Sequence, residues 1–204
     1  MTFADRWYRR IRFGAPIVVV SGLPRAGTSM AMKMLEAGGL PTLTDGIREP
    51  DDSNPKGYYE FEPVKQLDKR GETAWLAGAH GKAVKIISFL LTFLPETLDY
   101  RVVFMERDLD EVLASQNKML VARGERPDTT NDQKMRQVYT RHLEKIDRFL
   151  RNRRCFTTLT VRYKDAIEHP SVEARRISEF LGGHLNVERM AAVADRELYR
   201  NRKP

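Results

Sequence analysis

The chain has 204 residues, of which 41% are hydrophobic and 31% are charged, so its composition is that of a globular protein able to bury a core. A net charge of +7 favours an anionic partner: a nucleotide, a nucleic acid, an anionic lipid or an acidic glycan. The single cysteine excludes an internal disulfide, and the longest apolar stretch, VKIISFLLTFLP, is too short to span a bilayer. Because the first residues lack an apolar run of the signal-peptide type, we expect a cytoplasmic protein without stable membrane insertion.

Predicted strands and helices alternate along the chain. Apolar β-branched runs predict strands, and apolar residues at helical spacing between capping and glycine signals predict helices. The expected strands are 17–21, 83–88, 100–107 and 155–161, and the expected helices are 27–37, one that starts with a capping box of Asp108 and Glu111, 132–151 and 171–181. This alternation predicts one α/β domain over residues 1–204, with three α/β/α layers and a central parallel sheet.

Three further segments have distinct compositions. Residues 1–15 are expected to form a basic arm, and residues 185–204 a basic C-terminal segment. Residues 40–80 are rich in Gly, Pro, Asp and Asn over their first part, and a loop of this length inside a compact domain is usually functional. Because the same segment carries four aromatic side chains, we expect it to shape a binding pocket or a lid; they are Tyr58, Tyr59, Phe61 and Trp75.

The stretch VSGLPRAGTS, which follows the first predicted strand, has the features of a phosphate-binding loop. Gly22 and Gly27 have the spacing that lets backbone N–H groups converge on an anion at a helix N-terminus. Thr28 and Ser29 can add hydroxyl donors, and the Arg25 guanidinium can fork onto a phosphate or a transferring group. The alternative is a glycine-rich turn that only joins the strand to the helix.

The loop lacks the lysine that follows the second glycine in nucleotide-hydrolysing P-loops, and Thr28 stands in its place. The sequence PRAGTS, from Pro24 through Ala26 to Ser29, resembles the 5′-phosphosulfate loop of sulfotransferases, which reads Pro-Lys/Arg-x-Gly-Thr/Ser-Thr/Ser. This resemblance implies a P-loop NTPase-like fold and transfer of a sulfonate from 3′-phosphoadenosine 5′-phosphosulfate (PAPS) without a metal ion. The product of the donor would be 3′,5′-adenosine bisphosphate.

A second motif resembles the same family. In sulfotransferases an arginine at the end of a strand and a serine eight residues later, R-x-P-x-D-x-x-x-S, contact the 3′-phosphate of the donor. The chain has RDLDEVLAS, in which Arg107 and Ser115 take these positions, while Leu109 and Glu111 replace the usual proline and aspartate. The later stretch from VRYKD to FLGG resembles the family's Tyr-Glu-Asp-Leu segment and the helix after it, with Lys164 in place of the glutamate. The C-terminal Arg-Lys-Gly-x-x-Gly segment of many members is absent.

The resemblance also implies catalytic roles. Arg25 would stabilise the leaving phosphate oxygen, and Lys85, on the strand before the second motif, would reach the sulfonate. The family uses a His or a Glu as general base, and in members with a carboxylate it lies about twenty residues past the basic residue of the loop. The carboxylates that could serve are Asp45, Glu49 and Glu60, and the histidines that could serve are His80, which precedes a strand, and His142, on the apolar face of the long helix. The residues alone do not choose among them.

Three other functions are open at this point. A P-loop NTPase or small-molecule kinase would use Glu106 at the end of VVFME as a Walker B carboxylate. A nucleic-acid-binding module would use the arginines of residues 136–154, but Glu144 and Asp147 interleave with them as on a solvated helix face, so we expect no nucleic-acid partner. A catalytically inactive relative would keep only the nucleotide site. The expected partners are therefore a nucleotide donor and a small-molecule or sugar acceptor, with the oligomeric state open.

Overall fold

The computed structural model describes residues 9, 12–46, 59–69, 73–122, 124–125 and 132–194. Its centre is a five-stranded sheet in which every pair of neighbouring strands is parallel. The strands, in the order β2-β3-β1-β4-β5, are β2 (Thr42–Leu43), β3 (Ala83–Lys85), β1 (Ile17–Gly22), β4 (Tyr100–Glu106) and β5 (Phe156–Arg162). The predicted parallel sheet is confirmed.

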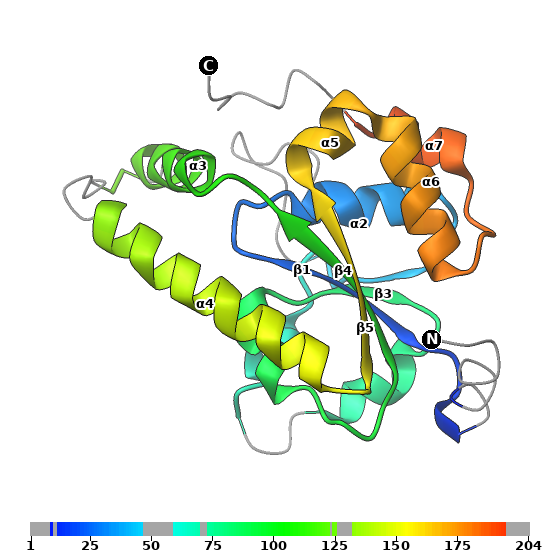
Figure 1. Ribbon diagram of the computed structural model, residues 1–204. Coiled ribbons are helices and arrows are strands. Elements are labelled where there is room, and N and C mark those ends of the chain that lie inside the picture. The colour runs from blue at the N-terminus through cyan, green and yellow to red at the C-terminus, as the bar shows by residue number, and fades with distance from the viewer. Residues whose placement is uncertain are drawn as a thin grey trace.

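Helices cover both faces of the sheet (Figure 1). One face carries α2 (Thr28–Ala37), α5 (Tyr163–Glu168), α6 (Pro170–Leu181) and α7 (Val187–Ala192). The other carries α4 (Asp132–Asn152) and three 3-10 helices, η1 (Glu62–Gln66), η2 (Ala74–Ala79) and η3 (Ser88–Phe93). Between β4 and α4, α3 (Leu109–Ala122) leaves the carboxyl end of the sheet and packs against the first part of α4. The predicted three layers are confirmed.

The central strand shows why these residues form a sheet. All six residues of β1 are buried, as expected for a strand covered on both faces. Ile17 and Val19 belong to the core beneath α4 and the 3-10 helices, while Val18 and Val20 belong to the core beneath α2. This alternation assigns each following residue to a face: the side chain of Ser21 continues the series of Ile17 and Val19.

The structure corrects one predicted strand and adds two helices. The strand predicted over 83–88 ends at Lys85, and the chain enters η3 at Ser88, where it packs against α4. Neither α5 nor α7 is evident from sequence periodicity, since each has only six residues. The helix α7 lies within the basic C-terminal segment, and it is anchored by the fully buried Met190.

Candidate functional site: the loop between β1 and α2

The loop after β1 has the backbone of an anion-binding turn. Arg25 and Gly27 both have left-handed backbones, with φ of 72° and 97°, and α2 begins immediately afterwards at Thr28. The first amides of a helix have no partners within it and point towards the N-terminus, where the helix dipole favours negative charge. The start of this ten-residue helix therefore offers N–H groups and a favourable dipole to which an anionic group can bind.

Two glycines let the loop pass close to its neighbours. A Cβ at Gly22 would lie 2.6 Å from the backbone oxygen of Met105, at the end of β4. A Cβ at Gly27 would lie 2.3 Å from Cδ2 of Tyr163, the first residue of α5. Both distances are too short for any side chain, so each glycine is required by the approach of another segment as well as by its backbone angle.

The structure brings Arg25, Arg107 and Ser115 into one cluster, although they lie far apart in the sequence. The Nε of Arg25 donates a hydrogen bond to Ser115 Oγ at 3.0 Å. The Nη1 of Arg107 donates to the backbone oxygen of Arg25 at 3.1 Å. The two motifs that the sequence analysis singled out therefore form a single site at the carboxyl end of β1 and β4.

Ser115 can serve two partners at once. Its side chain is on α3 and buried, and its oxygen accepts from Arg25. A hydroxyl has one O–H to donate and two lone pairs to accept with. Accepting from Arg25 thus leaves the O–H of Ser115 able to donate to a phosphate oxygen, so the contact with Arg25 is compatible with the predicted phosphate contact.

Besides its hydrogen bond to the backbone of Arg25, the Arg107 guanidinium contacts Glu111 and Tyr163. Its Nε donates to Glu111 Oε2 at 3.0 Å, and the two side chains are 8% and 6% exposed, so this ion pair is buried. Its guanidinium also lies over the ring of Tyr163, 4.4 Å from the ring centre. At the start of α3, Asp108 Oδ1 accepts from the backbone N of Asp110 at 2.8 Å, as a capping residue does, and Glu111, the other residue of the expected capping box, binds Arg107.

The sequence analysis assigned no role in the site to Tyr163. Its ring lies between Gly27 and Arg107 and so supports both the loop and the buried arginine. The signal that could have found it is strand register. Glu106 and Arg162 are paired at the ends of β4 and β5, so the residues that follow them, Arg107 and Tyr163, leave the sheet side by side. That register depends on the tertiary structure and cannot be read from either segment alone.

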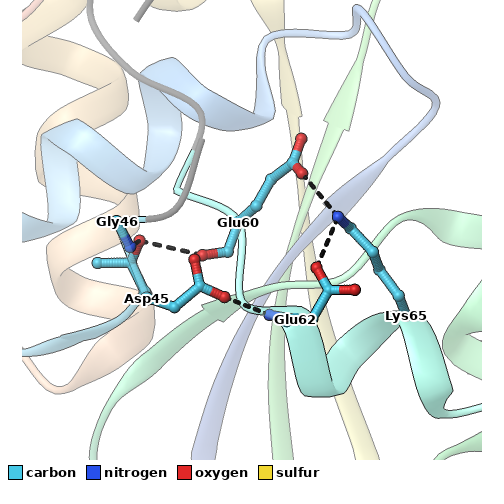
Figure 2. Close-up of polar contacts among 6 residues, drawn as sticks. Asp45, Gly46, Glu60, Glu62 and Lys65 are labelled. Carbon is cyan, nitrogen blue, oxygen red and sulfur yellow. Dashed lines mark hydrogen bonds and ion pairs between the residues drawn. The ribbon is translucent and has the colours of Figure 1, made fainter. Parts of the chain in front are cut away.

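The predicted carboxylates Asp45 and Glu60 form a separate network (Figure 2). Asp45 Oδ2 accepts from the backbone N of Glu62 at 2.5 Å, and Asp45 N donates to the backbone oxygen of Glu60 at 3.1 Å. Lys65 Nζ lies 3.3 Å from Glu60 Oε2 and 2.8 Å from Glu62 Oε2, and the hydrogen bond to Glu62 raises the pKa of Lys65. Glu49 lies outside the described residues.

Sheet order sets how far this network lies from the loop. Asp45 follows β2, which is two strands away from β1, and neighbouring strands are about 4.8 Å apart. The network therefore shares the carboxyl edge of the sheet with Arg25, but at a lateral distance of about 10 Å. Lys85 is nearer, because it ends β3 in register with Val20 of β1 and is half-buried there.

The structure separates the two candidate histidines. His80 Nδ1 makes a 2.7 Å hydrogen bond with the backbone oxygen of Ala15. Both residues precede their strands, so His80 lies at the edge of the sheet opposite to the loop and cannot be a base there. His142 Nε2 instead lies 2.9 Å from Oγ of Ser88, the first residue of η3, three residues past the carboxyl end of β3.

The aromatic side chains of residues 40–80 contribute mainly to packing where the structure describes them. Phe61 and Trp75 meet edge to face with ring centres 5.4 Å apart, against the core beneath η1 and η2. Tyr59 donates from its hydroxyl to Glu36 Oε2 at 2.5 Å, and burial is the main reason that the pKa of Tyr59 is raised. Tyr58 lies outside the described residues.

The described part of the chain has neither a group of metal-binding side chains nor a membrane-spanning helix. No three His, Cys, Asp or Glu side chains in those residues are grouped so that they could hold a metal ion. Likewise, none of the described helices has the length and apolar character that crossing a membrane requires.

Replacing Gly27 by alanine tests the close approach of Tyr163. We expect Gly27→Ala to lower the free energy of unfolding by about 1–3 kcal/mol more than Gly39→Ala, measured by urea denaturation. Gly39 is the matched control because its φ of 95° is nearly the same, but a Cβ there would meet nothing within 4 Å. Equal losses for the two variants would show that the ring of Tyr163 does not confine the loop.

Breaking the buried ion pair tests how Arg107 is held. Glu111→Ala leaves the guanidinium buried without its carboxylate, so we expect a loss of about 3 kcal/mol in the free energy of unfolding. The control is Asp147→Ala, which breaks an exposed pair with Arg151 on α4 and should cost about 0.5 kcal/mol or less. Chemical denaturation of both variants gives the comparison. A loss at Glu111 as small as that at Asp147 would contradict the buried pair.

Solved structures of known proteins resemble this chain. The crystal structure of sulfotransferase STF1 from Mycobacterium tuberculosis is similar, with a TM-score of 0.57 at 16% identity over 93% of this chain and 74% of that one. Also similar are a sulfotransferase domain from the curacin biosynthetic pathway (TM-score 0.45, 16% identity, 82% and 74% covered) and retinol dehydratase in complex with retinol and PAP (TM-score 0.49, 17% identity, 91% and 66% covered). No curated protein matches the sequence significantly.

The family itself is identified from the sequence. A sequence profile of the sulfotransferase family matches residues 65–186, which is more than half of the chain. The matched region includes β4, α3 and β5, and with them Arg107, Ser115 and Tyr163. Together with the fold shared with the mycobacterial enzyme, this match shows that the chain belongs to the sulfotransferase family.

Proposed function

We propose that this protein transfers a sulfonate group from PAPS to a hydroxyl or an amine of an acceptor. The observation that carries the proposal is the cluster of Arg25, Arg107 and Ser115 at the start of α2. It joins an anion-binding loop to a second cationic side chain, and PAPS carries anionic groups at both its 5′ and its 3′ positions. Family membership supports sulfonate transfer as the reaction class.

The loop would hold the 5′ end of the donor. Its backbone amides and the N-terminus of α2 suit the 5′-phosphate, and the hydroxyls of Thr28 and Ser29 supply further donors. Gly22 and Gly27 permit the close backbone approach, and Pro24 and Ala26 complete the turn between them. Arg25 has a flexible side chain anchored to Ser115, so its guanidinium lies between the loop and α3.

The 3′-phosphate would lie beside α3. The Arg107 guanidinium presents several N–H groups in a fixed plane, and Glu111 and Tyr163 hold that plane in place. The O–H of Ser115 supplies a neutral donor two turns along the same helix. Arg107 also donates to the backbone oxygen of Arg25. This hydrogen bond would link the subsite for the 3′-phosphate directly to the loop that would hold the 5′-phosphate.

In the reaction, the acceptor oxygen or nitrogen attacks sulfur while the bond from sulfur to the 5′-phosphate oxygen breaks. That oxygen takes the electron pair, and 3′,5′-adenosine bisphosphate leaves. Arg25 and Lys85 would offset the negative charge that develops on the leaving and equatorial oxygens. A base must take the acceptor's proton, and Asp45, Glu49 and Glu60 are the carboxylates that the sequence proposes for it.

The competing kinase reading depends on features that the loop does not have. Thr28 occupies the place of the phosphate-binding lysine, and its short side chain is buried at the start of α2. The cation of the loop is instead Arg25, whose side chain is directed to α3. This arrangement suits a donor that extends from the loop to α3, as a nucleotide with a 3′-phosphate does.

Ligand-dependent thermal stability distinguishes these functions. We expect 3′,5′-adenosine bisphosphate at 100 times its Kd to raise Tm by about 5–10 °C, because saturating binding adds about 2.7 kcal/mol to a domain of this size. Magnesium-ATP at the same concentration should raise Tm less. Differential scanning fluorimetry gives both values, and each variant is compared with its own ligand-free Tm.

Arginine variants test whether the bisphosphate raises Tm by binding at the loop and Arg107. Arg25→Ala and Arg107→Ala should each reduce the shift caused by the bisphosphate, whereas Arg148→Ala, at an exposed position on α4, should leave it unchanged. Stabilisation by magnesium-ATP alone would favour a kinase and contradict the proposal. Stabilisation by the bisphosphate without any sulfonate transfer would instead identify a nucleotide-binding relative that lacks activity.

A further inference from the structure

Strand register places Ser88 beside the loop. Val20 pairs with Lys85, and Ile86 N donates to the backbone oxygen of Val20 at 3.0 Å, so the pairing continues past the end of β3. Ile87 is still extended, which puts Ser88 level with Leu23 at the start of the loop. Adjacent strand positions are about 4.8 Å apart, so Ser88 lies about one strand spacing from the loop.

His142 is fixed to this position by two contacts. Its Nε2 lies 2.9 Å from Ser88 Oγ, and its ring stacks on Phe89 with centres 3.8 Å apart and planes 10° from parallel. One turn earlier on α4, Tyr139 donates from its hydroxyl to Gln116 Oε1 at 2.9 Å. Since Gln116 is next to Ser115, α4 is attached to the loop cluster from a second direction.

The same face of the sheet holds another polar group. Ser21 is the last residue before Gly22, is fully buried, and its Oγ has no hydrogen-bond partner among the described residues. Alternation along β1 directs it towards η3 and α4, the elements that carry Ser88 and His142. A buried hydroxyl without a partner costs about 1–3 kcal/mol, so its retention suits a place that a polar ligand group approaches.

Electrostatics keeps this imidazole neutral. Burial lowers the pKa of His142, and the positive charge of Lys145 on the same helix lowers it further. The side chains of η3, packed against this part of α4, include no ionisable group, and Lys85 precedes it on β3. At neutral pH the ring is therefore a base with a lone pair, and that form is lost only as the pH falls through the lowered pKa.

We propose that His142 is the general base of the sulfonate transfer and that Ser88 positions it. The proposal rests on the proposed function and adds the residue that activates the acceptor. With the Nε2 proton donated to Ser88 Oγ, the lone pair on Nδ1 takes the proton of the acceptor hydroxyl. The acceptor oxygen then forms the new bond to sulfur, and the bond from sulfur to the 5′-phosphate oxygen breaks with its electron pair on that oxygen. The imidazolium returns the proton to solvent.

The surroundings of His142 also indicate the acceptor class. Phe89 is 38% exposed while it stacks on the ring, and Phe93, on the same short helix, is 46% exposed. An apolar or aromatic molecule that carries a hydroxyl would place its body against these rings and its oxygen at the imidazole. The carboxylates Asp45 and Glu60 are less suited, because Asp45 caps η1 and Glu60 pairs with Lys65 about two strands from the loop.

An NMR titration of the histidine rings tests this position without any acceptor. We expect 3′,5′-adenosine bisphosphate to raise the pKa of His142 by about half a unit or more, because the anionic nucleotide favours the charged ring nearby. His184, which is exposed beyond α6, is the control and should not respond. A bisphosphate that binds and leaves the pKa of His142 unchanged would overturn the assignment. Absence of binding would overturn the proposed function itself.

Kinetics of variants test the chemical role. With PAPS and 2-naphthol as the acceptor probe, His142→Gln should lower the release of bisphosphate by about 10²–10⁴-fold and remove the acidic limb of its pH profile. The Kd for the bisphosphate should stay within about twofold, and His184→Gln should change neither quantity. Ser88→Ala should lower the rate less and move the acidic limb, as expected of a positioning residue. A His142→Gln variant that turns over at the wild-type rate would overturn the proposal.

Discussion

The buried guanidinium of Arg107 is the contact on which the site depends. It donates to Glu111 in the first turn of α3, lies over Tyr163 at the start of α5, and donates to the backbone of Arg25 in the loop. These three partners come from three different strand–helix connections of the sheet. A single side chain therefore fixes the loop after β1 relative to the ends of β4 and β5. This frame, formed by Arg107 and its three partners, also holds the loop in which Arg25 and Gly27 have left-handed backbones.

This frame divides the carboxyl edge of the sheet into two parts. The loop, α2 and α3 gather amides, guanidinium groups and the hydroxyl of Ser115, which together suit a nucleotide with an anionic group at both its 5′ and its 3′ position. On the opposite face, η3 and α4 bring together exposed aromatic rings and a neutral imidazole, which suit the hydroxyl of an apolar acceptor. The sulfur atom would be transferred between the two parts, beside the end of β1. The contact of Tyr139 with Gln116 joins them.

The sequence predicts those features of the fold and the site whose signals lie within a few neighbouring residues, and it misses those that depend on contacts between distant segments. The strands β1, β4 and β5 and the glycine-rich loop have signals within a few residues, and the structure has them where the sequence predicts them, to within about one residue. The spacing of Arg107 and Ser115 is also local, but their contacts with Arg25 are long-range and no local pattern predicts them. The capping-box pattern of Asp108 and Glu111 does not reveal that Glu111 also forms a buried ion pair with the arginine four residues earlier. The role of Tyr163 depends on the register of β4 with β5, which no local pattern contains.

The most direct test of the central claim is isothermal titration calorimetry of two nucleotides that differ only in the 3′-phosphate. The wild-type protein should bind 3′,5′-adenosine bisphosphate about 10–100 times more tightly than adenosine 5′-phosphate, since hydrogen bonds to a charged group contribute about 1.5–3 kcal/mol. In Arg107→Ala this ratio should fall close to one, while the affinity for adenosine 5′-phosphate changes little. An equal preference in the wild type and in Arg107→Ala would contradict the account, because the 3′-phosphate would then bind elsewhere.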